Sequence, residues 1–313
     1  MESVADTKLG WPDFLAEMNG TSSSGKMNWP NFYVVGPPKT GSTSLYWHLK
    51  RHPEVFLPSF KELRMFQPEH PDSLSPARYR NLYAEAKDYK AIGEVTPYYL
   101  VDPAVPGRVR EVSPAAKIVI LLRDPVERAY AHYLTVKEVN VATGHKEPSR
   151  SFAEALRNYE KTPIEQRRDL TTDYLEQGLY SAGVRQYLET FGSDQVLVLL
   201  FDDLAKDTKG VFERIAQHIG VDPDVFSNVD ASENRNPYRV PKYAAIRWGQ
   251  KMGLSGLLPH SLKVAMLPLF FKLRKTPLDG ESRRRLQQFY DRDITELEAL
   301  LGRKLPELRK SWI

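Results

Sequence analysis

Residues 31–52, NFYVVGPPKTGSTSLYWHLKRH, contain the feature that most restricts the fold of this chain. They begin with the apolar run Phe32–Val35, whose β-branched and aromatic residues are typical of a short buried strand. Small residues and prolines follow over 36–44, and a helix pattern then continues up to Pro53. A strand, a small-residue loop and a helix start direct backbone N–H groups and the positive end of a helix at one point. The stretch therefore predicts a phosphate-binding loop.

The loop differs from the Walker A motif, GxxxxGK[ST], in the position of its lysine. Gly36 and Gly41 have the Walker spacing, but Ser42 occupies the position of the Walker lysine, and Lys39 lies inside the loop. A kinase or nucleoside triphosphate hydrolase built on this loop lacks its usual γ-phosphate contact, which disfavours that class of enzyme. A turn that binds nothing is the alternative at this point, because Gly/Ser turns commonly join strands to helices.

Further apolar patterns predict the rest of the fold. Strand-like runs lie at 91–95, 117–122 and 195–201. The run at 117–122 is continuously apolar, as strands of a parallel sheet covered on both faces are. Helix patterns lie at 172–191, 208–219 and 281–302. We therefore expect an α/β fold with a P-loop-like central parallel β-sheet flanked by α-helices, in a single domain over 30–313.

Two segments stand apart from this core pattern. The first 29 residues are polar and are expected to form a flexible N-terminal segment, although Trp11 and Phe14 are candidates for docking on the body. Residues 242–275 mix cations with apolar residues. A lid, an acceptor-side helical segment, an interface and a membrane-surface helix are open interpretations there, with packing against the body as the default.

Composition limits the class of protein. The 313 residues are 41% hydrophobic and 27% charged, which is ordinary for a globular protein. A net charge of +4 favours an anionic ligand but is too small to predict a nucleic-acid partner. The absence of cysteine excludes disulfides and cysteine-ligated metals. No apolar run reaches the roughly 18 residues of a membrane span, and the first residues lack an apolar leader, so we expect a cytoplasmic location.

A second anion-binding residue is predicted where the 117–122 strand ends. Arg123 follows the strand directly, and Asp124 and Pro125 are typical of the first residues of a helix. Open α/β sheets bind ligands at the carboxyl ends of their strands, where the fork of an arginine suits a phosphate. The alternative is a structural arginine that pairs with Asp124 or with a helix C-terminus.

Glu62 has two interpretations as well. It lies beside Lys61 and two residues before Arg64, so a surface ion cluster is the plain interpretation of this carboxylate. A functional role requires that the fold bring Glu62 close to Lys39, which sequence spacing alone does not decide.

Taken in order, the motifs resemble those of sulfotransferases that use 3′-phosphoadenosine 5′-phosphosulfate (PAPS), and most closely the branch with heparan sulfate and bacterial enzymes. The resemblance rests on GPPKTGSTSL at 36–45, KELRMF at 61–66 and RDPVERAY at 123–130, followed by Gly178, Tyr180 and Trp312. It covers roughly residues 30–313. It implies transfer of a sulfuryl group, without a metal ion, to a hydroxyl or amine of a small natural product or carbohydrate.

The resemblance also implies a role for each site residue. Lys39 would neutralise the oxygen that leaves with adenosine 3′,5′-bisphosphate (PAP), Glu62 would be the general base, and Arg123 would hold the 3′-phosphate. The 5′-phosphate would be held by the N–H groups and hydroxyls of Thr40, Gly41, Ser42, Thr43 and Ser44. A P-loop kinase and an inactive nucleotide-binding module are the alternatives. The oligomeric state is not predicted.

Two positions depart from the family pattern. Ala131 stands where the family usually has a serine eight residues after the 3′-phosphate arginine, and Arg235 or Arg239 is our candidate for the donor that compensates. Val95 replaces the lysine that heparan-type enzymes carry in their E-K-[ST]-P segment. Since valine cannot pair with an anionic sugar, this residue argues against a heparan-like polysaccharide acceptor.

Overall fold

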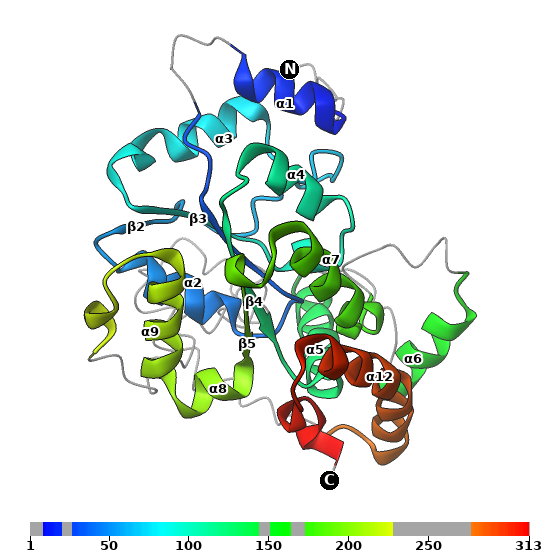
Figure 1. Cartoon of the computed structure of the whole chain (residues 1–313). Helices are drawn as coiled ribbons and strands as arrows, with labels where there is room; N and C mark the ends of the chain where they lie inside the picture. Colours follow the sequence, from blue (N-terminus) through cyan, green and yellow to red (C-terminus); the bar gives the residue numbers. More distant parts are fainter. Residues whose placement is uncertain (1–8, 21–26, 144–150, 164–172, 228–276, 313) are drawn as a thin grey trace, which may run out of the picture. The chain divides into compact units, whose positions relative to one another are not determined.

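The computed structural model describes residues 9–20, 27–143, 151–163, 173–227 and 277–312 (Figure 1). The chain divides into two compact units. The first contains residues 1–123, 180–234 and 296–303. The second contains residues 124–179, 235–295 and 304–313. The single domain over 30–313 stays a prediction.

The first unit is built on a five-stranded parallel sheet with the order β2-β3-β1-β4-β5. The strands are β1 (Phe32–Val35), β2 (Val55–Phe56), β3 (Ala91–Val95), β4 (Lys117–Leu122) and β5 (Val196–Leu200). β1 lies between β3 and β4, so that Val34 is in register with Val95 on one side and Val119 on the other. The predicted central parallel sheet is confirmed. The short strand β2 was not predicted.

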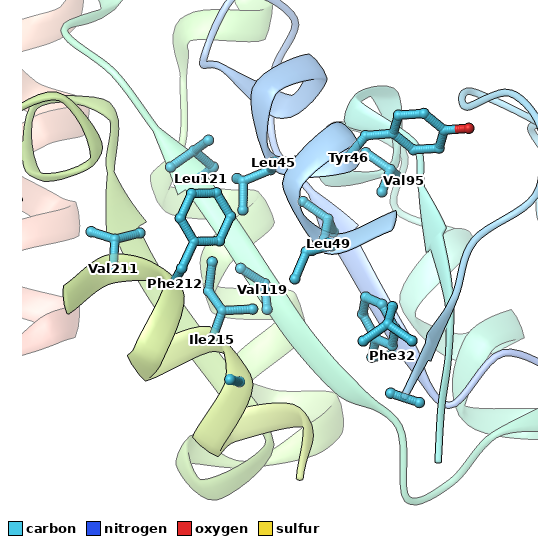
Figure 2. Packing of buried hydrophobic residues seen from close by; sticks show 14 of the residues in the cluster. Phe32, Leu45, Tyr46, Leu49, Val95, Val119, Leu121, Val211, Phe212 and Ile215 are labelled. Atoms are coloured by element: carbon cyan, nitrogen blue, oxygen red, sulfur yellow. The ribbon is translucent and has the colours of Figure 1, made fainter. Parts of the chain in front are cut away.

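Helices cover both faces of this sheet. Those of the first unit are α1 (Trp11–Asn19), α2 (Ser42–Lys50), α3 (Pro76–Tyr83), α4 (Val105–Val112), α7 (Ser181–Phe191), α8 (Phe201–Lys206) and α9 (Thr208–Ile219). Because strand side chains alternate between faces, Phe32 and Val34 join the cluster formed with α2 and α9. Figure 2 shows Leu45 of α2 and Phe212 of α9 in this cluster. By the same alternation Tyr33 lies on the opposite face, where its hydroxyl donates to Ser113 Oγ, at the end of α4, at 3.5 Å. Figure 1 shows α4 beside α7.

A helix lies within the segment that we expected to be flexible. In α1, Trp11 Nε1 donates a hydrogen bond to Glu111 Oε2 at 2.9 Å, and Phe14 is 1% exposed. The Phe14 ring packs edge-on against Tyr79 at 5.7 Å between centroids. Burial of two aromatic side chains is a sufficient driving force to anchor so short a helix.

The second unit contains α5 (Pro125–Thr143), α6 (Phe152–Lys161) and most of α12 (Gly280–Leu301). At the start of α5, Asp124 Oδ1 accepts hydrogen bonds from the backbone N–H of Val126 at 2.9 Å and of Glu127 at 3.2 Å. This is the N-cap arrangement that the sequence predicts.

Short 3₁₀ helices also occur in both units. They occupy Ala84–Asp88, Pro97–Leu100, Glu176–Gly178, Ser193–Gln195, Pro223–Phe226 and Pro306–Trp312.

The helix predicted over 172–191 is wrong in its first half, because α7 begins only at Ser181. Within the second unit, the Tyr290 hydroxyl donates to Leu175 O at 2.9 Å. The Tyr290 ring fills the space beside Gly178, where a Cβ atom would lie 2.7 Å from it. These long-range contacts determine the backbone conformation at 175–178. The local hydrophobic pattern does not encode them, so the sequence did not predict this conformation. The helix predicted over 208–219 is confirmed as α9.

Candidate active site

The loop between β1 and α2 has two positions that require glycine. Gly36 has φ 144° and a Cβ atom there would lie 2.4 Å from Leu121 O. Gly41, the N-cap of α2, has φ 98°, and a Cβ atom there would lie 2.9 Å from the Phe201 ring. Both values of φ favour glycine. The two glycines therefore let the loop backbone pack directly on β4 and on Phe201.

The loop presents backbone N–H groups that have no partner within the part of the chain that the structure describes. They belong to Gly41, Ser42 and Thr43. The Ser44 N–H donates to Gly41 O at 3.0 Å and so begins the hydrogen-bonded turns of α2. The Thr40 hydroxyl donates to Pro37 O at 2.9 Å, which holds the turn that precedes these groups. Such N–H groups at a helix start, together with the helix dipole, suit an anion.

Three non-glycine residues within the described ranges have a left-handed backbone. They are Lys39 with φ 76°, Glu62 with φ 65° and Arg64 with φ 58°. This conformation costs on the order of 1–3 kcal/mol per residue and persists only where surrounding contacts enforce it. Two of the three are the predicted catalytic residues, and backbone strain of this kind is typical of functional sites.

Arg123 lies directly beside the loop. Its Nη1 donates to Lys39 O at 3.0 Å, and its Cζ lies 4.8 Å from the centroid of the Phe201 ring. The Tyr180 hydroxyl donates to Arg123 O at 2.8 Å. Phe201 therefore contacts the guanidinium and also packs against Gly41. The fold thus brings together the loop and the arginine that the sequence predicts as its partner.

Glu62 is attached to the strand on the other side of the loop. Its backbone N–H donates to Val95 O at the end of β3 at 2.9 Å. Its side chain is 38% exposed, and Oε1 accepts a hydrogen bond from Lys61 Nζ. The ion pair of the plain interpretation is therefore present. Glu62 is nevertheless held at the carboxyl end of the strand adjacent to β1.

The segment that follows Glu62 is held by several side chains. The Tyr79 hydroxyl donates to Leu63 O, and Ser73 Oγ donates to Arg64 O at 3.2 Å. Arg64 is buried, with Nη1 donating to Gln67 Oε1 at 3.1 Å and Cζ at 4.2 Å from the Tyr98 ring centroid. The first two hydrogen bonds restrain the backbone at Leu63 and Arg64, and the last two contacts restrain the Arg64 side chain. Such restraint keeps a catalytic carboxylate in one geometry.

These residues share one edge of the sheet. Lys39 follows β1, Arg123 follows β4, and Glu62 is bonded to the end of β3, and these three strands are neighbours. The sequence did not predict the contacts of Tyr180 and Phe201, although Tyr180 belongs to a motif and Phe201 directly follows a strand. The structure tests no role for Arg235, which lies outside the described residues, as do Arg239 and 242–275.

The described residues contain neither a metal-binding cluster nor a helix that could span a membrane. No group of three or more histidine, aspartate or glutamate side chains is arranged there to hold a metal ion. Across the same residues, every helix is too short or too polar to cross a bilayer.

Comparison with known proteins identifies the family to which this fold and this loop belong. Residues 30–236 match the family described as the sulfotransferase domain. The chain therefore belongs to the sulfotransferase family. A crystal structure of a sulfotransferase from Alicyclobacillus acidocaldarius is 27% identical, with a TM-score of 0.67 and coverage of 90% of this chain and 100% of that chain. The predicted family and fold class are confirmed.

Two curated relatives are much longer than this chain. Membrane-associated sulfotransferase kil1 of Dictyostelium discoideum is 36% identical over 105 residues, which cover 33% of this chain and 22% of that protein. Bifunctional heparan sulfate N-deacetylase/N-sulfotransferase 4 of Mus musculus is 26% identical over 294 residues, which cover 91% of this chain and 31% of that protein. The chain thus spans less than a third of the length of either relative.

Proposed function

We propose that this sulfotransferase moves a sulfuryl group from PAPS to a hydroxyl or amine of a carbohydrate or small natural product. The observation that carries the proposal is the hydrogen bond from Arg123 to Lys39 O, at 3.0 Å. It joins a phosphate-binding loop and a phosphate-binding arginine at one edge of the sheet. A nucleotide with phosphates on both its 5′ and 3′ sides matches two adjacent anion sites. A nucleoside triphosphate has its phosphates in a single chain.

The roles of the residues follow from charge. The N–H groups of residues 41–43 bind the 5′-phosphate, and the guanidinium of Arg123 binds the 3′-phosphate. The acceptor oxygen or nitrogen forms its new bond to sulfur while the bond from sulfur to the phosphate oxygen breaks. Lys39 stabilises the charge that develops on this leaving oxygen, and the Glu62 carboxylate takes the acceptor proton.

Phe60 is our proposed contact for the acceptor. It is 39% exposed, precedes Glu62 by two residues, and has Arg78 Cζ at 5.9 Å from its ring centroid. An exposed aromatic face beside a general base suits the apolar face of a sugar or an aromatic ring. Carbohydrate sulfotransferase 15 of Mus musculus, 24% identical over 247 residues, supports this class of acceptor. Val95 is 2% exposed in the core cluster, so no acceptor contact is assigned to it.

Ligand-induced stabilisation tests the donor. We expect PAP to raise the melting temperature in a concentration-dependent way, since a ligand that binds only the folded state stabilises it. ATP with Mg²⁺ is the matched control, and a larger shift with ATP would contradict the proposal. A panel of sugars and phenols with PAPS and a mass readout then tests the acceptor.

The cytoplasmic location also stays a proposal, and fractionation of cells that produce the chain tests it.

A further inference from the structure

A carboxylate that the mechanism does not use is buried beneath the segment that carries Glu62. Glu94 of β3 is 1% exposed. Its Oε1 accepts hydrogen bonds from Thr96 Oγ1 at 2.8 Å and from the Tyr99 hydroxyl at 2.5 Å. Burial of a carboxylate is unfavourable unless its partners compensate for lost hydration, so a hydrophobic residue here would be the simpler choice for stability.

Tyr99 connects this carboxylate to the 62–66 segment. While its O–H donates to Glu94, its oxygen accepts a hydrogen bond from the Phe66 backbone N–H at 3.1 Å. The other end of the segment is bonded to the same strand, since the Glu62 N–H donates to Val95 O at 2.9 Å. The segment is therefore held to β3 at both ends. Its left-handed residues, Glu62 and Arg64, lie at or between the two attachment points.

We propose that Glu94 is a positioning residue for sulfuryl transfer, whose ionised carboxylate acts through Tyr99 to hold residues 62–66 and thereby present Glu62 to the acceptor. This inference rests on the proposed role of Glu62 as the general base. Glu94 itself touches neither donor nor acceptor in the proposal.

The ionised form is the one that holds the segment. A carboxylate only accepts hydrogen bonds, so it keeps the Tyr99 O–H directed toward it and leaves the Tyr99 oxygen facing the Phe66 N–H. Protonation of Glu94 removes the negative charge that strengthens the hydrogen bond from the Tyr99 hydroxyl. Protonation therefore weakens the attachment of the segment at Phe66.

The tyrosine hydroxyls that surround Glu94 do not titrate in the same range as its carboxyl group. Burial raises the pKa of the nearby tyrosine hydroxyls, which belong to Tyr33, Tyr79, Tyr83, Tyr99 and Tyr187. The charged side chains that interact with these tyrosines are Arg64, near Tyr79, and Asp102, near Tyr187. Burial raises the pKa of Glu94 to about 7, against hydrogen bonds from Tyr99, Thr96 and the Met65 backbone that lower it.

Two variants and one matched control test the inference by kinetics. Glu94→Gln and Tyr99→Phe are expected to lower kcat by about 10- to 100-fold, the scale of a small misplacement of a catalytic group. Both are expected to leave PAP affinity within about twofold. The acid limb of the wild-type pH–rate profile near pH 7 is expected to disappear in Glu94→Gln. Tyr187→Phe removes another buried hydroxyl, one that donates to Tyr99 O at 3.2 Å without contacting 62–66, and is expected to keep the wild-type kcat.

Hydrogen exchange gives a readout that does not depend on activity. Amide exchange in a peptide covering 60–67 is expected to be faster in Glu94→Gln and Tyr99→Phe than in wild type, and unchanged in Tyr187→Phe. A protein that binds no PAP but shows this exchange pattern would contradict the proposed function and support the attachment. Wild-type exchange and kcat in Glu94→Gln, or an equal loss in Tyr187→Phe, would overturn the inference.

Discussion

Replacing Glu94 by glutamine is expected to change how stability depends on pH. Burial raises the pKa of Glu94 from 4.5 to about 7 in the folded protein. Between these two values the unfolded chain has released the proton that the folded chain retains, so unfolding releases a proton. The free energy of unfolding therefore falls as pH rises through this window. Below it both states are protonated, and above it the folded state bears the full cost of the buried charge.

The size of the effect follows from the two pKa values. A change from 4.5 to about 7 corresponds to about 3 kcal/mol of destabilisation once both states are ionised. Most of this, about 2 kcal/mol, accumulates between about pH 5 and about pH 8. Glutamine cannot ionise, so the Glu94→Gln variant lacks this contribution. Relative to the variant, the wild-type protein is expected to lose about 2 kcal/mol of stability over that range.

Urea denaturation of both proteins at the two pH values measures this difference. Thr96→Val is a control of opposite sign, because it removes a hydrogen bond that lowers the pKa of Glu94 and leaves the carboxylate in place. It is expected to steepen the loss of stability with pH. Parallel pH–stability curves for wild type and Glu94→Gln would refute the reasoning. Glu94→Gln is also expected to lose activity. At high pH this variant would therefore be more stable than the wild-type protein and have a lower turnover.

Four further substitutions test the site. Lys39→Ala is expected to lower kcat by about 10²–10³-fold, as loss of one charge-stabilising donor does, measured in single-turnover sulfuryl transfer. Glu62→Gln is expected to abolish turnover while PAP affinity stays within a few fold, and loss of PAP binding instead would assign Glu62 to the donor pocket. Gly41→Ala is expected to weaken PAP binding, since its Cβ would lie 2.9 Å from the Phe201 ring, and calorimetry measures this. Phe60→Ala is expected to raise the KM for the acceptor and leave that for PAPS unchanged.

Local sequence patterns were sufficient for much of the fold. Continuous apolar runs predicted β1, β4 and β5, because a strand buried on both faces needs apolar residues at every position. The strand-like run at 91–95 predicted β3. The glycines and small residues at 36–44 predicted the loop, since only such residues permit its backbone. The motif order then predicted Lys39 and Arg123 as partners. Their contact follows from topology, because adjacent parallel strands end at the same edge of a sheet.

Contacts between distant residues were decided by the tertiary structure alone. The sequence predicts Gly178 within a helix, but in the structure the Tyr290 ring occupies the space beside it. It predicts Phe201 as the end of a strand, but the Phe201 ring packs against Gly41 and the Arg123 guanidinium. The sequence predicts Glu94 as a polar residue of a short strand. Its burial among tyrosine side chains depends on the tertiary structure. Local periodicity encodes the conformation of a segment, whereas burial, ionisation and strain depend on the segments that pack against it.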